Sequence, residues 1–298
     1  CIASDFDVDG VFAGYILWRG IRRCGGQAYV EAPDRVMEGY GLNERIVLQA
    51  KKRGAGCILT CDNGIAALEP IRLAKSLGLK VIVTDHHEVI YRTEIDEAGN
   101  EQRIYELPCA DAVIDPKQAE CEYPFKGLCG AGVAYKFIEL LYRKFEISKE
   151  ALYELVPFAA IATVADVMDL VDENRILVKY GLKGLSKTKH LGLQAIMHHS
   201  SLDKDAITAY HGFVIGPCFN AAGRLDTADM AIRLLQTEDK NTAERLASEL
   251  VELNQSRKEM TVLGYERAVR MIEEEKLNES SVMVLCLVFQ VHHFLWMV

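Results

Sequence analysis

Several patterns that would announce a function directly are missing from this sequence. Its nine cysteines contain no CxxC pair, and their odd number with no signal peptide favours a reducing cytoplasm over a disulfide framework. We interpret them as small buried hydrophobes. No GxxxxGK[ST] loop is present either, which argues against ATP hydrolysis.

Basic residues are outnumbered by acidic ones. There are 34 Lys and Arg against 43 Asp and Glu, which gives a formal net charge of −9. Proteins that coat nucleic acid depend on clustered cationic side chains, so this class is disfavoured. A nuclease is not excluded, because a site built from carboxylates regains affinity for phosphate through the metal cations that it binds.

Long apolar runs are nearly absent. The one candidate is the stretch 282–298, and Gln290, His292 and His293 interrupt it. A membrane span needs roughly 20 predominantly apolar residues. We therefore expect no membrane association, and we interpret this stretch as a core strand followed by a truncated or aberrant terminus.

Half of the 298 residues are apolar, which is enough for a substantial core. Up to about Asp115, short apolar runs alternate with helix-length amphipathic stretches, and this alternation is typical of an α/β fold with a parallel β-sheet flanked by helices. The runs are CIAS from Cys1, AYVEA from Ala28, CILTC from Cys57, KVIVT from Lys80 and AVI from Ala112. The intervening helices are expected at 11–23, 43–53 and 66–77, and the pattern from 131 to 168 is mostly helical.

A long helix without proline is expected from Asn241 to about Glu275. At 1.5 Å per residue it would extend about 50 Å, which suits a connection between two domains.

Three of the apolar runs end in acidic residues. The acids and histidines concerned are Asp5, Asp7 and Asp9 in SDFDVDG, Asp62 in CDNGI, and Asp85, His86 and His87 in TDHHE. The carboxyl ends of parallel strands lie at one edge of a sheet, so these side chains should meet. Two carboxylates about 4 Å apart repel by about 4 kcal/mol at an effective dielectric of 20, and divalent cations remove that conflict. Oxygen and imidazole ligands without thiolates favour Mn²⁺ or Mg²⁺ over Zn²⁺.

Each motif alone has a simpler interpretation. Asp5 begins the pattern DxDxDG of a calcium loop, but Ile16 stands where that loop requires Glu. Asp62 alone could be a turn residue or a helix cap. Asp166, in the apolar segment IATVADVMDL, either sits inside a helix and binds a metal or caps a helix end facing solvent. The joint occurrence of the motifs after three strands favours a metal site.

Taken together, SDFDVDG, CDNGI, TDHHE and TVADV resemble the DHH phosphoesterase family, and GPCFNAAGRLDTA from Gly216 to Ala228 resembles its RecJ branch. The resemblance implies two divalent cations, with Asp62 bridging them. The implied metal ligands are Asp7, Asp9, Asp62, His86 and Asp166. Implied catalytic or supporting positions are Asp5 and Asp85, with His87 facing the scissile phosphate, and implied substrate-binding residues are Asn220 and Arg224.

The sequence departs from the family pattern at two positions. Ala3 stands where the family often has His, and Cys218 stands where RecJ relatives frequently have a basic residue. The resemblance also implies a domain division. Residues 1–235 would form the catalytic DHH domain with a helical C-terminal part, 236–280 a connecting helix, and 281–298 a truncated or aberrant start of the second domain.

The expected activity is two-metal hydrolysis of single-stranded DNA from the 5′ end to mononucleotides, as in DNA repair and recombination. Two alternatives stay open: a phosphodiesterase of the same family acting on short oligonucleotides, cyclic dinucleotides or pyrophosphate, and a non-catalytic member that binds DNA or replication proteins. A helicase and a single-strand-binding protein are partners implied by resemblance. We expect a cytoplasmic monomer.

Overall fold

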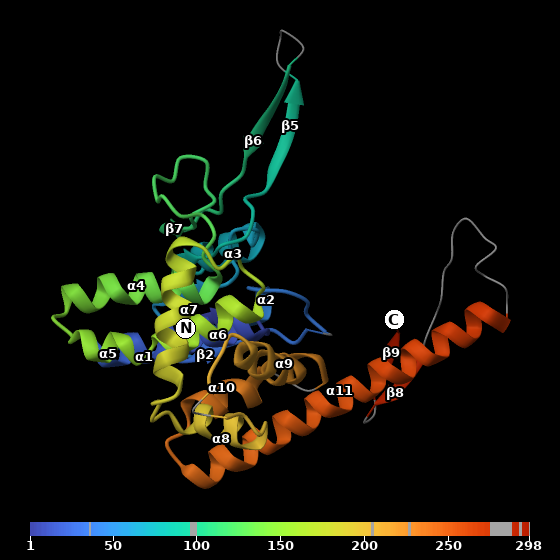
Figure 1. The fold of residues 1–298 in the computed structure, drawn as a ribbon. Coiled ribbons are helices and arrows are strands. Elements are labelled where there is room, and N and C mark those ends of the chain that lie inside the picture. Colours follow the sequence, from blue (N-terminus) through green and yellow to red (C-terminus); the bar gives the residue numbers. More distant parts are fainter. Residues whose placement is uncertain are drawn as a thin grey trace.

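Five parallel strands lie at the centre of the molecule in the computed structural model (Figure 1). The structure describes residues 1–35, 37–95, 100–203, 206–225, 228–274, 288–291 and 294–297. The strand order is β2-β1-β3-β4-β7, and every neighbouring pair is parallel. The strands are β1 Ile2–Ser4, β2 Val30–Glu31, β3 Cys57–Cys61, β4 Lys80–Thr84 and β7 Ala112–Ile114. Each lies within one of the five expected apolar runs.

Helices cover both faces of this sheet. The helices concerned are α1 Val8–Arg23 and α4 Gly130–Lys144 for one face, and α2 Glu44–Lys52 and α3 Leu68–Ser76 for the other. Ile2 and Leu59 pack in the same core as α1 and α4, whereas Ala3 and Ile58 pack in the core that contains α2 and α3. Successive side chains of a strand point to opposite faces, so strands covered on both sides must be apolar throughout. This explains why the strands appear as continuous apolar runs.

The second half of the described chain is helical up to the last strands, which confirms the expected fold class. Its shorter helices are α5 Lys149–Tyr153, α6 Val156–Ala165, α7 Asp172–Leu185, α8 Leu191–His199, α9 Tyr210–Leu225 and α10 Ala228–Gln236. Helix α6 is apolar on all sides and is buried from Val156 to Val164. A helix of this kind belongs in the interior, packed on several neighbours.

The expected long helix is present as α11, Lys240–Glu274, which at 35 residues is about 52 Å long (Figure 1). Leu246 and Leu250 in its first half are buried in the core, whereas Leu263 and Tyr265 in its second half are exposed. Its role as a connection and the division of the chain into domains stay predictions.

No helix in the described part of the chain combines the length and apolar character that crossing a bilayer requires.

Three details differ from the expectations. Helix α1 begins at Val8 instead of residue 11, because Asp7 caps it. A hairpin of β5 Tyr91–Ile95 and β6 Glu101–Tyr105 was not expected, and it projects away from the rest of the molecule (Figure 1). Where a single core strand was expected near the C-terminus, β8 Val288–Val291 pairs antiparallel with β9 Phe294–Met297. Residues 281–287 of that expected segment lie outside the described part.

Candidate metal centre

The acidic residues converge at the carboxyl edge of the sheet. Asp5 directly follows β1, Asp62 follows β3 and Asp85 follows β4, and all three are buried. Asp62 Oδ1 lies 2.9 Å from His86 Nε2, and Asp9 Oδ2 lies 3.6 Å from the same nitrogen. Side chains far apart in the chain therefore share one small volume.

Three overlapping groups of ligand atoms make up this cluster. Within each group the atoms lie within 4.8 Å of one another, and the groups are Asp5, Asp7 and Asp62; Asp9, His86 and Asp166; and Asp62, His86 and His87. Asp62 and His86 each belong to two groups, so the three groups are continuous. The structure thus brings together all five residues that the resemblance implies as metal ligands, together with Asp5 and His87.

The loop after β1 is held by two helix N-termini. Asp7 Oδ1 accepts from the N–H of Gly10 at 3.0 Å and so caps α1. Asp9, in the first turn of α1, accepts from the N–H groups of Gly130 at 2.6 Å and Ala131 at 2.7 Å. These donors are at the N-terminus of α4, where unpaired N–H groups and the helix dipole favour negative charge. The Asp9 carboxylate therefore holds the first turn of α1 against the N-terminus of α4.

Asp62 is held in an unusual backbone conformation. Its φ is 60°, in the left-handed region that Asp and Asn tolerate better than most residues. The start of α4 passes so close that a Cβ added at Gly130 would lie 2.6 Å from Asp62 Cβ. Glycine is required at this position because any side chain would displace the Asp62 carboxylate.

Without cations, the clustered carboxyls hold protons more tightly than usual. Burial raises the pKa of Asp62 well above its ordinary value, and the nearby Asp9 and Asp7 raise it further. Burial and the neighbouring Asp7 raise the pKa of Asp5 to about 7. Burial with Asp9 and Asp7 raises the pKa of Asp166 to about 7 as well. These are the shifts expected where anionic groups crowd together in a poorly hydrated site.

Buried atoms without a hydrogen-bond partner indicate which kind of ligand the cluster can bind. Asp62 Oδ1 and His86 Nδ1 are both buried without a hydrogen-bond partner, and the 2.9 Å approach of Asp62 Oδ1 to His86 Nε2 lacks hydrogen-bond geometry. An unsatisfied buried polar atom costs about 1–3 kcal/mol. Burial also lowers the pKa of His86, which keeps its imidazole neutral, as metal coordination requires. Carboxylates that face a neutral imidazole form a donor set suited to divalent cations.

Asp85 has a different environment from the other acids. It accepts from the N–H of Ile65 at 2.9 Å and of His86 at 2.8 Å, and His87 Nδ1 lies 2.7 Å from its Oδ1. Burial alone would raise its pKa, but the bonds to His87 and the main chain outweigh that effect and lower it. The bond to Asp85 in turn raises the pKa of His87, whose side chain is 56% exposed. Asp85 therefore orients His87 at the open side of the cluster.

Asp166 lies at a different place in its helix from the one expected. It is the C-cap of α6 and lies outside the helix interior, and Val167 after it has a φ of 57°. It therefore occupies the helix end that the alternative interpretation expected, but it is half-buried and lies against Asp9 and His86. A carboxylate at a helix C-terminus meets the negative end of the dipole, which makes a cation partner more favourable.

The two residues implied for substrate binding lie on α9. Asn220 Oδ1 accepts from the N–H of Val8 at 2.7 Å, so its amide oxygen contacts the main chain between Asp7 and Asp9. Arg224 belongs to the same helix, but its side chain lies outside the described part of the structure. Substrate contact by either residue stays a prediction.

Asp115, which was not among the predicted site residues, follows β7 at the same edge of the sheet. It is buried, its Oδ1 accepts from the N–H of Lys117 at 2.8 Å, and its Oδ2 has no hydrogen-bond partner. Burial raises its pKa to about 6. The signal was available, because Asp115 is one more acid directly after an expected strand.

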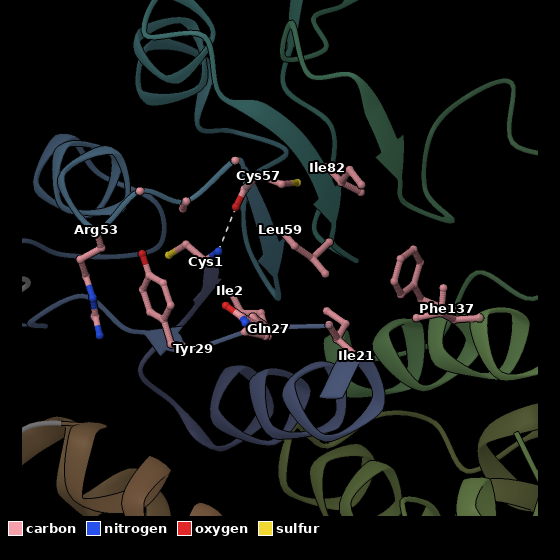
Figure 2. Close-up of a pocket in the computed structure, with 15 residues that line it drawn as sticks. Cys1, Ile2, Ile21, Gln27, Tyr29, Arg53, Cys57, Leu59, Ile82 and Phe137 are labelled. Atoms are coloured by element: carbon pink, nitrogen blue, oxygen red, sulfur yellow. Dashed lines mark hydrogen bonds between the residues drawn. The ribbon is translucent and has the colours of Figure 1, made fainter. Parts of the chain in front are cut away.

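Two other features lie away from this centre. A pocket of about 830 Å³ lies where the strands begin, and Figure 2 shows Cys1 at its wall donating from the terminal amine to the carbonyl of Cys57 at 2.9 Å. On α8 and α11, His198 Nδ1 and His199 Nε2 lie 3.4 and 3.0 Å from Glu244 Oε2, near the surface. Neither adjoins the acidic cluster.

A sequence profile described as "DHH family, N-terminal domain" matches residues 1–163. The chain belongs to the DHH family. Within the family it is similar to the single-stranded-DNA-specific exonuclease RecJ of Bacillus subtilis, with 39% identity over 95% of this chain and 34% of that protein. It is 37% identical to the same-named protein of Escherichia coli over 87% of this chain and 44% of that protein.

Solved structures agree with this relationship. A crystal structure of exonuclease RecJ bound to manganese superposes with a TM-score of 0.76 at 30% identity, covering 89% of this chain and 63% of that one. RecJ from Thermus thermophilus in complex with Mg²⁺ gives a TM-score of 0.62 at 26% identity, covering 95% of this chain and 34% of that one. This DHH chain spans about a third to a half of the length of the curated relatives it matches.

Proposed function

We propose that this chain carries the catalytic centre of a metal-dependent phosphodiesterase that degrades single-stranded DNA from its 5′ end to mononucleotides. The observation that carries the proposal is that Asp62 belongs both to an all-carboxylate group, with Asp5 and Asp7, and to the group that contains His86 and His87. Such sharing suits a ligand that bridges two cations. The relatives named as single-stranded-DNA-specific exonucleases supply the substrate and, through their family, the role in DNA repair and recombination.

Mn²⁺ or Mg²⁺ suits this set of carboxylates and a neutral imidazole, and solved RecJ structures with either ion share the fold. The proposed ligands are Asp7, Asp9, Asp62, His86 and Asp166. When bound, two such cations would lower the pKa of a water molecule and neutralise charge on the scissile phosphate.

The residues around the cations have separate tasks in this proposal. His87, held by Asp85, offers its exposed imidazole edge to a phosphate oxygen. Asp5 accepts from the N–H of Gly41 at 3.2 Å, which fixes the loop after β1 against the loop between β2 and α2. Arg224 offers a planar fork of donors to the nucleotide phosphate.

A cysteine nucleophile is not needed, and the nearby thiols are unsuited to the task. Cys61 and Cys129 lie beside the cluster, both completely buried. Burial raises the pKa of each thiol well above its ordinary value, and the neighbouring Asp9 raises it further. Thiols in such surroundings stay protonated and unreactive.

We also propose a cytoplasmic location, a monomeric state, and a helicase and a single-strand-binding protein as partners. The free cysteines throughout the described part of the chain are consistent with a reducing compartment. The partners rest on the relationship to the RecJ branch alone.

The experiment that tests this function uses a 5′-labelled single-stranded oligonucleotide incubated with the full chain and Mn²⁺. Release of labelled mononucleotide, with a labelled duplex left intact, is the expected result. Cleavage of dinucleotides alone would favour the oligonucleotide phosphodiesterase, and binding without cleavage would favour a non-catalytic member. Asp62→Asn serves as the inactive control.

A further inference from the structure

We propose that Asn220 is a positioning residue for the metal centre, and that α9 is the surface on which the metal-binding segments are assembled. This inference rests on the proposed function, because it assigns the GPCFNAAGRLDTA segment a task within the same site. Its central contact is the hydrogen bond from the N–H of Val8 to Asn220 Oδ1, 2.7 Å long, between residues 212 positions apart.

The N–H of Val8 needs a partner from outside its own helix. Val8 is the first residue of α1, and the first N–H groups of a helix have no acceptor within it. Asp7 accepts from Gly10 in the same turn, which leaves the N–H of Val8 to Asn220. Because Val8 lies between Asp7 and Asp9, this one bond fixes the main chain from which both carboxylates extend.

The same helix is packed closely against both metal-binding segments. A Cβ added at Gly223 would lie 2.8 Å from the carbonyl oxygen of Phe6, next to Asp7. A Cβ added at Gly216 would lie 2.6 Å from Ala165 Cβ, next to Asp166. Helix α9 therefore contacts the loop after β1 and the end of α6 at once, and its position sets the spacing between carboxylates that are distant in the sequence.

A residue that positions the metal ligands and a residue that contacts the substrate should affect different measured constants when they are substituted. A residue that positions metal ligands changes the affinity for Mn²⁺ in the absence of DNA, and partners of this kind typically contribute about 10–100-fold to metal affinity. A residue that contacts only the nucleotide changes KM for DNA and leaves Mn²⁺ binding unaltered. The half-buried location of Asn220 and the use of its oxygen by Val8 favour the first role.

The test measures Mn²⁺ binding by calorimetry on the full chain without DNA, together with kcat and KM for a single-stranded oligonucleotide at saturating Mn²⁺. For Asn220→Ala we expect Mn²⁺ affinity to fall about 10-fold or more and kcat to fall, with KM for DNA within about 2-fold of wild type. Asn220→Asp keeps an acceptor oxygen, so it should retain Mn²⁺ affinity within about 3-fold or bind more tightly.

Ser148→Ala is the matched control. It removes a comparable bond, from the N–H of Ala151 to a capping side chain at 3.3 Å, at the start of α5 and away from the cluster. Mn²⁺ affinity should be unchanged in this variant.

The proposal is overturned if Asn220→Ala raises only KM for DNA, or if it leaves both Mn²⁺ affinity and kcat unchanged. It is also overturned if Ser148→Ala weakens Mn²⁺ binding as much as Asn220→Ala does. If Asn220→Ala does not fold, Asn220→Asp decides, because a loss of Mn²⁺ affinity of about 10-fold in that variant contradicts the acceptor role. A wild-type chain that binds Mn²⁺ yet leaves DNA intact would overturn the proposed function while leaving this inference standing.

Discussion

Asp62→Asn is expected to stabilise the metal-free protein while abolishing its activity. The Asp62 carboxylate is buried among Asp9, Asp7, Asp5 and Asp85, and its pKa is raised well above the ordinary value by burial and by those charges. Asn has nearly the same shape, carries no charge and tolerates the φ of 60° at this position. The substitution therefore removes repulsion without adding backbone strain.

The size of the effect follows from the repulsion between charges. Two carboxylates about 4 Å apart repel by about 1 kcal/mol in water and about 4 kcal/mol at an effective dielectric of 20. Partial protonation of the cluster relieves part of this energy, so we expect the free energy of unfolding in EDTA at pH 8 to rise by about 1–4 kcal/mol. For a chain of this size each kcal/mol raises Tm by about 2–4 °C.

Thermal denaturation in EDTA measures the stability, and the labelled-oligonucleotide assay with Mn²⁺ measures the activity. Loss of the shared ligand should remove several kcal/mol of charge stabilisation, which corresponds to a fall in rate of about 100-fold or more. Asp111→Asn is the control, because Asp111 is paired with Lys75 at 2.6 Å and its loss should not stabilise the fold. A variant Asp62→Asn that is no more stable than wild type in EDTA would contradict the expected repulsion, and one that still degrades DNA would exclude Asp62 as an essential ligand.

The remaining predictions concern the same centre. Gly130→Ala places a Cβ 2.6 Å from Asp62 Cβ, so it should destabilise the protein by about 1–3 kcal/mol and weaken Mn²⁺ binding, and normal affinity in calorimetry would contradict the close approach. The pKa of Asp5, raised to about 7 from 3.8, makes the folded metal-free protein bind more protons than the unfolded chain, so stability should fall as the pH rises from about 4 to about 7. The expected loss of stability approaches about 4 kcal/mol for this buried group alone. Urea denaturation in EDTA measures it, and a stability that rises between pH 4 and pH 7 would contradict the raised pKa of Asp5. His87→Gln should lower kcat while leaving Mn²⁺ affinity within about 3-fold, and loss of Mn²⁺ binding would show instead that His87 is a ligand.

The sheet and the convergence of its acids could be predicted from the sequence because both follow from local patterns. Strands buried on two faces are continuous apolar runs, and the parallel order directs residues 5, 62 and 85 to one edge. Asp115 directly follows Ala112–Ile114, which is one of the expected strands, so the same rule places it at this edge as well. It was not included among the predicted site residues, although the rule was sufficient to find it.

The parts that were not predicted depend on contacts that no local pattern records. The β5–β6 hairpin is exposed on both faces, so no alternation of apolar and polar residues marks it. Asp166 was expected inside a helix because the apolar pattern continues past it, whereas the chain turns at Val167 with a positive φ. The bond between Asn220 and Val8 joins segments 212 positions apart and appears only once the fold is known.

Anomalous diffraction from crystals of this chain grown with Mn²⁺ would locate the cations directly. We expect two manganese peaks at the carboxyl edge of the sheet, with Asp62 coordinating both and with His86 and Asp166 among the other ligands. A single peak there, two peaks without Asp62 between them, or manganese only at a distant group such as His198, His199 and Glu244 would contradict this expectation.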